Sequence, residues 1–173
     1  MNPVQPGKAS IRKATKADCA LIFSWIKKLA KEEHRENKVM SSMEMFEKDG
    51  FGECPSFHSI ILEYNNRPVG FGLYYFGYGS WIGKTIVVDD VYIEPEFRSS
   101  GLGALAFAYI AQEALKNECM RLEGFVYHEE MPMTAAFYLK YGAHVEKGLW
   151  RCQLNGHGEI KKVTGLLEKK ANS

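Results

Sequence analysis

The hydrophobic and polar pattern of the first fifty residues predicts an edge strand followed by two helices. Residues 10–14 alternate as in a strand, and Thr15 and Asp18 have the spacing of a weak capping box before a helix. Apolar side chains then recur at helical spacing, at Cys19, Ile22, Phe23, Ile26 and Leu29. The charged residues 31–38 predict a solvated helix end or loop, and residues 42–48 predict a short second helix.

Three apolar segments follow, and they predict an antiparallel meander. Residues 57–64, 69–78 and 85–93 are rich in β-branched and aromatic side chains and are separated by turn signals. Residues 104–115 then predict a long helix, and residues 121–126 a short strand. This last strand is the return limb of a βαβ crossover, so we expect it to lie parallel to the third meander strand.

The remaining sequence predicts smaller elements. These are a short helix over residues 133–141 ended by Gly142, a strand or hairpin over residues 144–154, and a polar terminal helix over residues 159–170. No internal repeat or linker interrupts the chain, so we expect one domain over residues 1–173, with residues 1–9 flexible.

Composition narrows the possible partners. Of the 173 residues, 46% are hydrophobic and 25% charged, as is typical of globular proteins, and the formal net charge of +1 favours neither nucleic acid nor a membrane surface. The four cysteines form no C-x-x-C pair and the histidines show no H-x-x-x-H spacing, so we expect neither a metal site nor a disulfide framework. Without an apolar leader or a membrane-length apolar run, a cytoplasmic location is expected.

A glycine-rich turn joins the third meander strand to the long helix. Arg98, Gly101 and Gly103 form R-x-x-G-x-G, and free amides at such a helix start favour a phosphate or pyrophosphate. A Walker A loop is excluded because no Lys-Ser/Thr pair follows Gly103. Gly101, Gly103 and Ala106 match the letters of a dinucleotide fingerprint, but the turn follows an antiparallel meander. A turn that only packs in the core remains the alternative for so short a motif.

This order of elements with R-x-x-G-x-G resembles the GCN5-related N-acetyltransferases (GNAT superfamily). Its diamine acetyltransferase branch, with the spermidine/spermine and thialysine acetyltransferases, is similar at IRKATKADC, D-G-F-G-E, Y-Y-F, W-I-G-K and A-F-Y-L-K-Y-G-A, over nearly the whole chain. The resemblance implies an α/β fold of the α+β-like kind. In it a mixed, mostly antiparallel central sheet has a parallel strand pair splayed around acetyl-CoA, with helices on both faces.

The same resemblance implies acetyl-CoA as the acetyl donor. Backbone groups at Val91–Ile93 are expected to pair with the pantetheine arm, and the turn is expected to hold the pyrophosphate. Ser99 stands where the family commonly has glycine, and Met131 where it has asparagine. The expected donor contacts are Val91, Tyr92, Ile93, Arg98, Ser99, Ser100, Gly101, Leu102, Gly103, Ala104, Met131, Thr134 and Tyr141.

The acceptor side needs groups that attract and deprotonate an amine, because a primary amine with a lysine-like pKa of about 10 is protonated at neutral pH. Asp89 and Asp90 lie mid-strand, where a regular strand would turn only one of them toward a given pocket. The resemblance places Asp89 at the family's catalytic glutamate, one methylene shorter, which favours a bridging water. It implies Tyr138 as the general acid. Expected substrate contacts are Glu32, Glu33, Trp81, Asp89, Asp90 and Trp150.

The resemblance therefore implies acetyl transfer to the primary amine of a small diamine, polyamine or thialysine-like amino acid, by direct attack in a ternary complex. The polyamine enzymes carry an acidic residue just before W-I-G-K, which is absent from residues 78–81 here, so we expect a smaller amine than spermine. A protein or peptide N-acetyltransferase and a non-catalytic acetyl-CoA or polyamine-binding module remain alternatives. The family is usually homodimeric, so a homodimer is expected.

Overall fold

A computed structural model describes residues 7–126, 132–146, 148 and 151–171. Contacts along the chain divide it into two compact units, Met1–Phe125 and Val126–Ser173. The prediction of one domain over the whole chain therefore stays a prediction.

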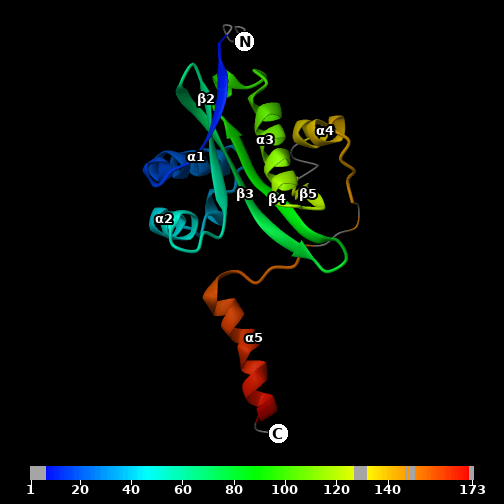
Figure 1. Ribbon diagram of the computed structural model, residues 1–173. Coiled ribbons are helices and arrows are strands. Elements are labelled where there is room, and N and C mark those ends of the chain that lie inside the picture. The colour runs from blue at the N-terminus through cyan, green and yellow to red at the C-terminus, as the bar shows by residue number, and fades with distance from the viewer. Residues whose placement is uncertain (1–6, 127–131, 147, 149–150, 172–173) are drawn as a thin grey trace. The chain divides into compact units, whose positions relative to one another are not determined.

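The first unit is built on a five-stranded sheet whose spatial order follows the sequence (Figure 1). Neighbouring strands are antiparallel from the first to the fourth, whereas the fourth and fifth are parallel. The strands are β1 (Ala9–Lys13), β2 (His58–Tyr64), β3 (Arg67–Gly79), β4 (Gly83–Ile93) and β5 (Arg121–Gly124). The predicted meander and the parallel return strand are confirmed.

Helices cover both faces of this sheet because alternate strand residues are apolar on each side (Figure 1). On one face, α1 (Cys19–Glu32) and α2 (Met43–Phe51) bury Trp25, Phe46 and Phe71. On the other, α3 (Leu102–Lys116) lays Leu102, Ala106, Ile110 and Ala114 over the sheet. The charged segment after α1 contains a short 3₁₀ turn, Glu36–Lys38, in agreement with the predicted loop.

The second unit contains α4 (Pro132–Lys140) and α5 (Gly156–Ala171), which confirms both predicted helices. After α4, Ala143 N–H donates to Tyr138 C=O and Gly142 N–H to Leu139 C=O, with Gly142 at φ 85°. This is the Schellman arrangement that makes a glycine the natural stop.

The predicted strand or hairpin over residues 144–154 is wrong for the residues that the structure describes. Residues 143–146 and 151–155 have no regular secondary structure and are mostly exposed. Gly148 adopts φ 90°, a left-handed value that a continuous strand does not accommodate.

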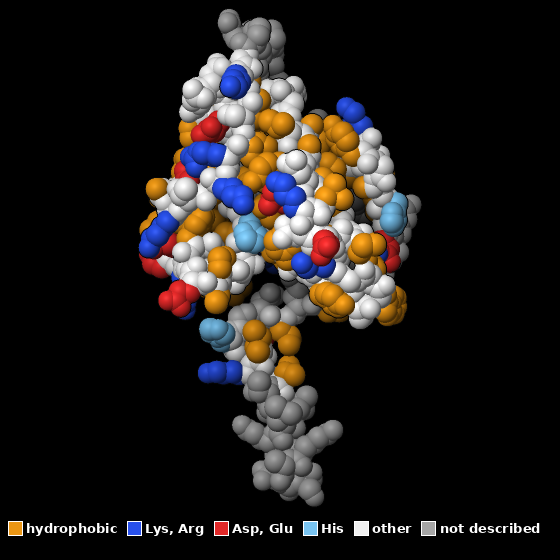
Figure 2. Space-filling view, viewed as in Figure 1, with side chains coloured by type: hydrophobic (Ala, Val, Ile, Leu, Met, Phe, Trp, Pro, Cys, Tyr) orange, Lys and Arg blue, Asp and Glu red, His pale blue; other side chains and the backbone are white. Residues whose placement is uncertain are grey.

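Charges of both signs are interspersed on the face shown in Figure 2, and no large region of one sign stands out there. No helix in the described ranges is both long and apolar enough to span a bilayer. Within the same ranges, no three His, Cys, Asp or Glu side chains cluster as metal ligands would.

The entry to α1 is held by a buried carboxylate. Asp18 accepts two hydrogen bonds of 2.8 Å from the Arg12 guanidinium and further bonds from the N–H and hydroxyl of Thr15, which are 2.8 and 2.9 Å long. Arg12 also binds Glu63 on β2 at 2.9 Å. These bonds hold the pKa of Asp18 well below its ordinary value, chiefly through Arg12. Arg12 and Asp18 together thus join β1, β2 and the start of α1.

We expect Asp18→Asn to lower the free energy of unfolding at pH 7 by roughly 1–3 kcal/mol, because it removes a charged partner of buried hydrogen bonds. Because the folded pKa is depressed, this contribution is present above pH 4 and is lost as pH falls toward the folded pKa. Urea unfolding measures it. The matched control is Lys16→Ala, whose exposed pair with Glu47 should change stability by less than about 0.5 kcal/mol. Equal losses in the two variants would contradict the assignment.

Candidate functional site

A β-bulge at Asp89 interrupts β4 in the middle. Leu73 faces Asp90 and Tyr74 faces Val88 across the β3–β4 pair, so Asp89 is the extra residue. Asp90 shares its face with Leu73, on the α1 side of the sheet, whereas Val88 packs against α3. The Asp89 side chain is exposed and that of Asp90 is half-buried.

The environment of Asp90 favours its neutral form. Burial, and after it the negative charges of Asp89 and Glu33, raise the pKa of Asp90 to about 7. Glu33 directly follows α1, so the end of that helix lies within electrostatic reach of the bulge. The structure therefore brings three of the predicted acceptor residues together.

One edge of β4 beyond the bulge is open in the described part of the chain. The parallel ladder with β5 runs only from Thr85 to Val88, while Val91–Ile93 pair with β3 on their other edge. Two strands that pair in one half and separate in the next leave backbone N–H and C=O groups unpaired. The Ile93 C=O accepts a hydrogen bond from Arg98, and the remaining groups of this edge suit extended amides such as those of a pantetheine arm.

The turn before α3 has the backbone of an anion site. Gly101 adopts φ 88°, and the first i to i−4 bond of α3 runs from Leu105 N–H to Gly101 C=O at 3.0 Å. The N–H groups of Leu102, Gly103 and Ala104 therefore lack such a partner and point out of the helix start. Ser99 also lies in the left-handed region, at φ 64°, which glycine would occupy more readily. Ser100 donates to Phe97 C=O at 2.6 Å, which closes the turn.

Arg98 binds protein groups. Its Nη2 lies 2.6 and 2.9 Å from the two carboxylate oxygens of Glu32, and its Nε donates to Ile93 C=O at 2.9 Å. The guanidinium also lies over the Tyr92 ring, 5.7 Å from its centre. Glu32, predicted as an amine contact, and Arg98, predicted as a pyrophosphate contact, therefore bind each other.

Trp81 is not brought to this cluster. Trp81 is 97% exposed at the tip of the β3–β4 hairpin, roughly 20 Å along the strand from Asp89. Met131 and Trp150 lie outside the described residues.

Thr134, Tyr138 and Tyr141 belong to the second unit, at i, i+4 and i+7 along α4 and the turn after it. Burial raises the pKa of the half-buried Tyr138, so its phenol stays protonated at neutral pH. The roles predicted for these three residues stay predictions.

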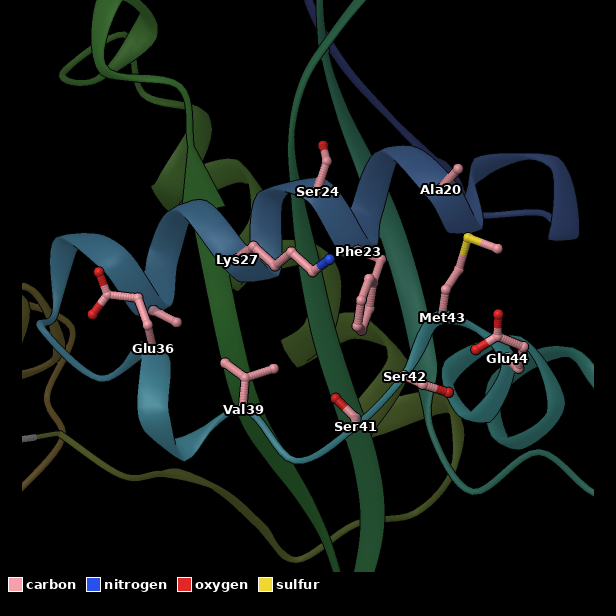
Figure 3. A pocket seen from close by; sticks show the side chains of 11 residues that line it. Ala20, Phe23, Ser24, Lys27, Glu36, Val39, Ser41, Ser42, Met43 and Glu44 are labelled. Atoms are coloured by element: carbon pink, nitrogen blue, oxygen red, sulfur yellow. The ribbon is translucent and has the colours of Figure 1, made fainter.

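A separate hollow lies on the outer side of α1, between that helix and the segment that leads into α2 (Figure 3). Lys27 and Phe23 from α1 and Val39 and Ser41 from the segment line it. None of the predicted site residues is among its lining residues.

A sequence profile of the acetyltransferase (GNAT) family matches residues 24–143. The chain belongs to this family. It is therefore an N-acetyltransferase, and the family predicted from R-x-x-G-x-G and its surroundings is confirmed.

Two curated relatives place the chain more narrowly among GNAT proteins. The thialysine N-ε-acetyltransferase of Bos taurus is 38% identical over 120 residues, which cover 65% of this chain and 71% of the relative. The human spermidine/spermine N(1)-acetyltransferase-like protein 1 is 34% identical over 116 residues, which cover 63% of this chain and 17% of that protein.

Solved structures confirm the fold. A predicted acetyltransferase with acetyl-CoA from Clostridium acetobutylicum superposes with a TM-score of 0.68, at 19% identity over 85% of this chain and 97% of its own. GNAT acetyltransferases use acetyl-CoA. The open edge of β4 fits its pantetheine arm, and the N–H groups of the turn before α3 fit its pyrophosphate.

Because the pKa of Asp90 is raised on folding, the folded state binds more protons than the unfolded state between about pH 4 and 7. Stability should therefore fall as pH rises through this window. We expect Asp90→Asn to remove this fall and to raise the Tm at pH 8 by roughly 2–4 °C, with little effect near pH 4. Thermal unfolding followed by circular dichroism measures this. Asp49→Asn, at an exposed position, is the control and should keep the wild-type pH dependence.

Proposed function

We propose that this protein transfers the acetyl group of acetyl-CoA to the primary amine of a small diamine or a thialysine-like amino acid. The observation that carries the proposal is the half-buried Asp90, with a pKa raised to about 7, beside Asp89 and Glu33 and next to the open edge of β4. A cluster of carboxylates attracts an organic cation, and the open edge can hold the acetyl donor alongside it.

Donor binding is supported by backbone geometry. The free N–H groups at the start of α3 suit a pyrophosphate, and the β4 edge at Val91–Ile93 suits the pantetheine amides. The acetyl thioester would then lie near the bulge, because the edge leads back along β4 to Asp89 and Asp90.

Proton removal from the amine is the task of the acidic pair. A base works best when its pKa lies near the operating pH, which supports Asp90 as the acceptor of the amine proton. Asp89, predicted as the base through a bridging water, contributes a negative charge that adds to the effect of burial on the pKa of Asp90. The free amine attacks the thioester carbonyl within a ternary complex, the N–C bond forms, the C–S bond breaks, and the nitrogen loses its second proton to solvent as the amide forms.

Protonation of the leaving thiolate is the role proposed for Tyr138. The thiolate's conjugate acid has a cysteine-like pKa of about 8.5, and a phenol kept neutral by burial is suited to supply the proton. This step is independent of the choice between Asp89 and Asp90 as base.

A short acceptor is supported by the distribution of charge. Three carboxylates lie around the bulge, but the hairpin tip at residues 78–81 adds no acidic residue for a long polycation. The curated relative from Bos taurus is named for thialysine. We also propose a homodimer, supported by the complete exposure of Trp81, a residue type enriched in interfaces.

An amine panel with acetyl-CoA, followed by release of the free thiol, tests the proposed function. We expect kcat/KM for thialysine and short diamines to exceed that for spermidine and spermine. A preference for spermidine would contradict the short acceptor. Acetylation of peptide amines alone would favour the protein acetyltransferase. Binding of acetyl-CoA without turnover of any amine would favour the non-catalytic module.

We expect Tyr138→Phe to lower kcat by roughly 10²-fold or more, because it removes the proton donor and leaves the ring in place. Steady-state kinetics with the best amine of the panel measures this. The control is Tyr109→Phe on α3, a half-buried tyrosine outside the proposed site, which should keep the wild-type rate. An unchanged kcat in Tyr138→Phe would exclude the general-acid role.

A further inference from the structure

The contact between Arg98 and Glu32 joins the donor turn to the last residue of α1. A single guanidinium nitrogen, Nη2, binds both carboxylate oxygens, and Nε binds the Ile93 carbonyl at the end of β4. Nη1 makes no hydrogen bond to any residue that the structure describes. Arg98 therefore connects the end of α1 to the end of β4, and its Nη1 remains available to a ligand.

The tie is the last of a series along one face of α1. Trp25, Lys28 and Glu32 are spaced i, i+3 and i+7, so they lie on the same side of the helix. Trp25 Nε1 and Lys28 Nζ contact Glu94 at 3.2 and 3.5 Å, immediately after β4. The role of Glu94 was not predicted from the sequence, although an acidic residue stands there between the strand and Pro95. This series aligns the end of α1 with the end of β4.

Glu33 depends on this alignment because it directly follows Glu32. The turn that ends α1 is closed by bonds from Glu33 N–H to Leu29 C=O at 3.0 Å and from Arg35 N–H to Ala30 C=O at 2.7 Å. Its middle residue, His34, is in the left-handed region at φ 54°. The backbone of Glu33 is therefore fixed to the helix end, and the distance from Glu33 to Asp90 follows the position of that end.

We propose that Glu32 is a positioning residue that acts through Arg98 and couples the donor and acceptor sites. This inference rests on the proposed function, in which Glu33 and Asp90 face the amine. The tie holds Glu33 beside Asp90, and the Glu32 carboxylate partly neutralises the guanidinium next to the pyrophosphate turn. Glu32 thus strengthens amine binding and weakens donor binding, without touching either ligand.

Because Glu32 strengthens amine binding and weakens donor binding, its removal should change the two affinities in opposite directions. A general structural effect would weaken both. We expect Glu32→Gln to weaken binding of 1,3-diaminopropane and to tighten binding of coenzyme A, each by about two- to fivefold, the range of an exposed ion pair. Both changes act through Arg98, so the same substitution should have no further effect in an Arg98→Gln background.

Isothermal titration calorimetry on the full chain measures both dissociation constants for wild type, Glu32→Gln, Arg98→Gln and the double variant. Glu36→Gln, which removes an exposed charge four residues further on, is the matched control and should leave both constants unchanged. Changes of the same sign in Glu32→Gln, or an undiminished effect in the double variant, would overturn the proposal. Unfolding curves for each variant show whether it folds, and Glu32→Asp, which keeps the charge, should restore part of the wild-type pattern.

These titrations need no turnover, so they separate this inference from the proposed function. If no amine of the panel is acetylated but Glu32→Gln still tightens binding of coenzyme A, the proposed acetyl acceptor is rejected and the role of the Glu32–Arg98 pair stands. An active panel with no response to Glu32→Gln would do the reverse.

Discussion

The parallel pairing of β4 with β5 stops at Val88, and the organisation of the candidate site depends on that point. Before it, β4 is an ordinary central strand, hydrogen-bonded on both edges. After it, the bulge turns Asp90 toward α1, and no strand in the described part of the chain pairs with the other edge of Val91–Ile93. The crossover through α3 then brings the glycine turn to the end of the same strand. A single strand can therefore serve two substrates, because its backbone offers amides to one of them and its side chains offer charge to the other.

Carboxylates in this protein show how the surroundings decide what an acid does. Asp18 and Asp90 are both largely shielded from water, but Asp18 has a guanidinium and a backbone N–H as partners, and its pKa falls. Burial raises the pKa of Asp90, and two nearby carboxylates add to the rise. The partners of Asp18 stabilise its ionised form, and their hydrogen bonds hold the fold together. The surroundings of Asp90 disfavour its ionisation and so lower the stability of the folded protein, which is the usual sign of a group retained for chemistry. The family motif IRKATKADC is accordingly explained in large part by structure, since its Arg12 and Asp18 anchor α1.

Local patterns in the sequence were sufficient for most of the fold. β-Branched and aromatic composition between turn signals identified β2, β3 and β4, apolar spacing identified α1, strong helix formers identified α3, and Gly142 marked the end of α4, because each signal lies within a few neighbouring residues. Two kinds of feature were not accessible. The strand or hairpin predicted over residues 144–154 failed because local composition does not reveal whether a segment finds a strand to pair with, and residues 143–146 and 151–155 form no strand. The tie between Arg98 and Glu32 joins residues 66 positions apart, and nothing local to either one indicates the other. The bulge could not be located from the sequence either, since adjacent acidic residues do not reveal which of them is extra.

The bulge also means that β4 contains one residue more than the sheet needs. The side chains up to Val88 alternate regularly between the two faces of the sheet, and those from Asp90 onward do the same. The second alternation continues the first as if position 89 did not exist. The sheet therefore has no geometric need for Asp89. Omitting that one residue would give an unbroken ladder and would leave each later side chain on its present face. In this respect β4 is a complete strand that carries one inserted amino acid, and the insertion accounts for the second acidic side chain beside the donor edge.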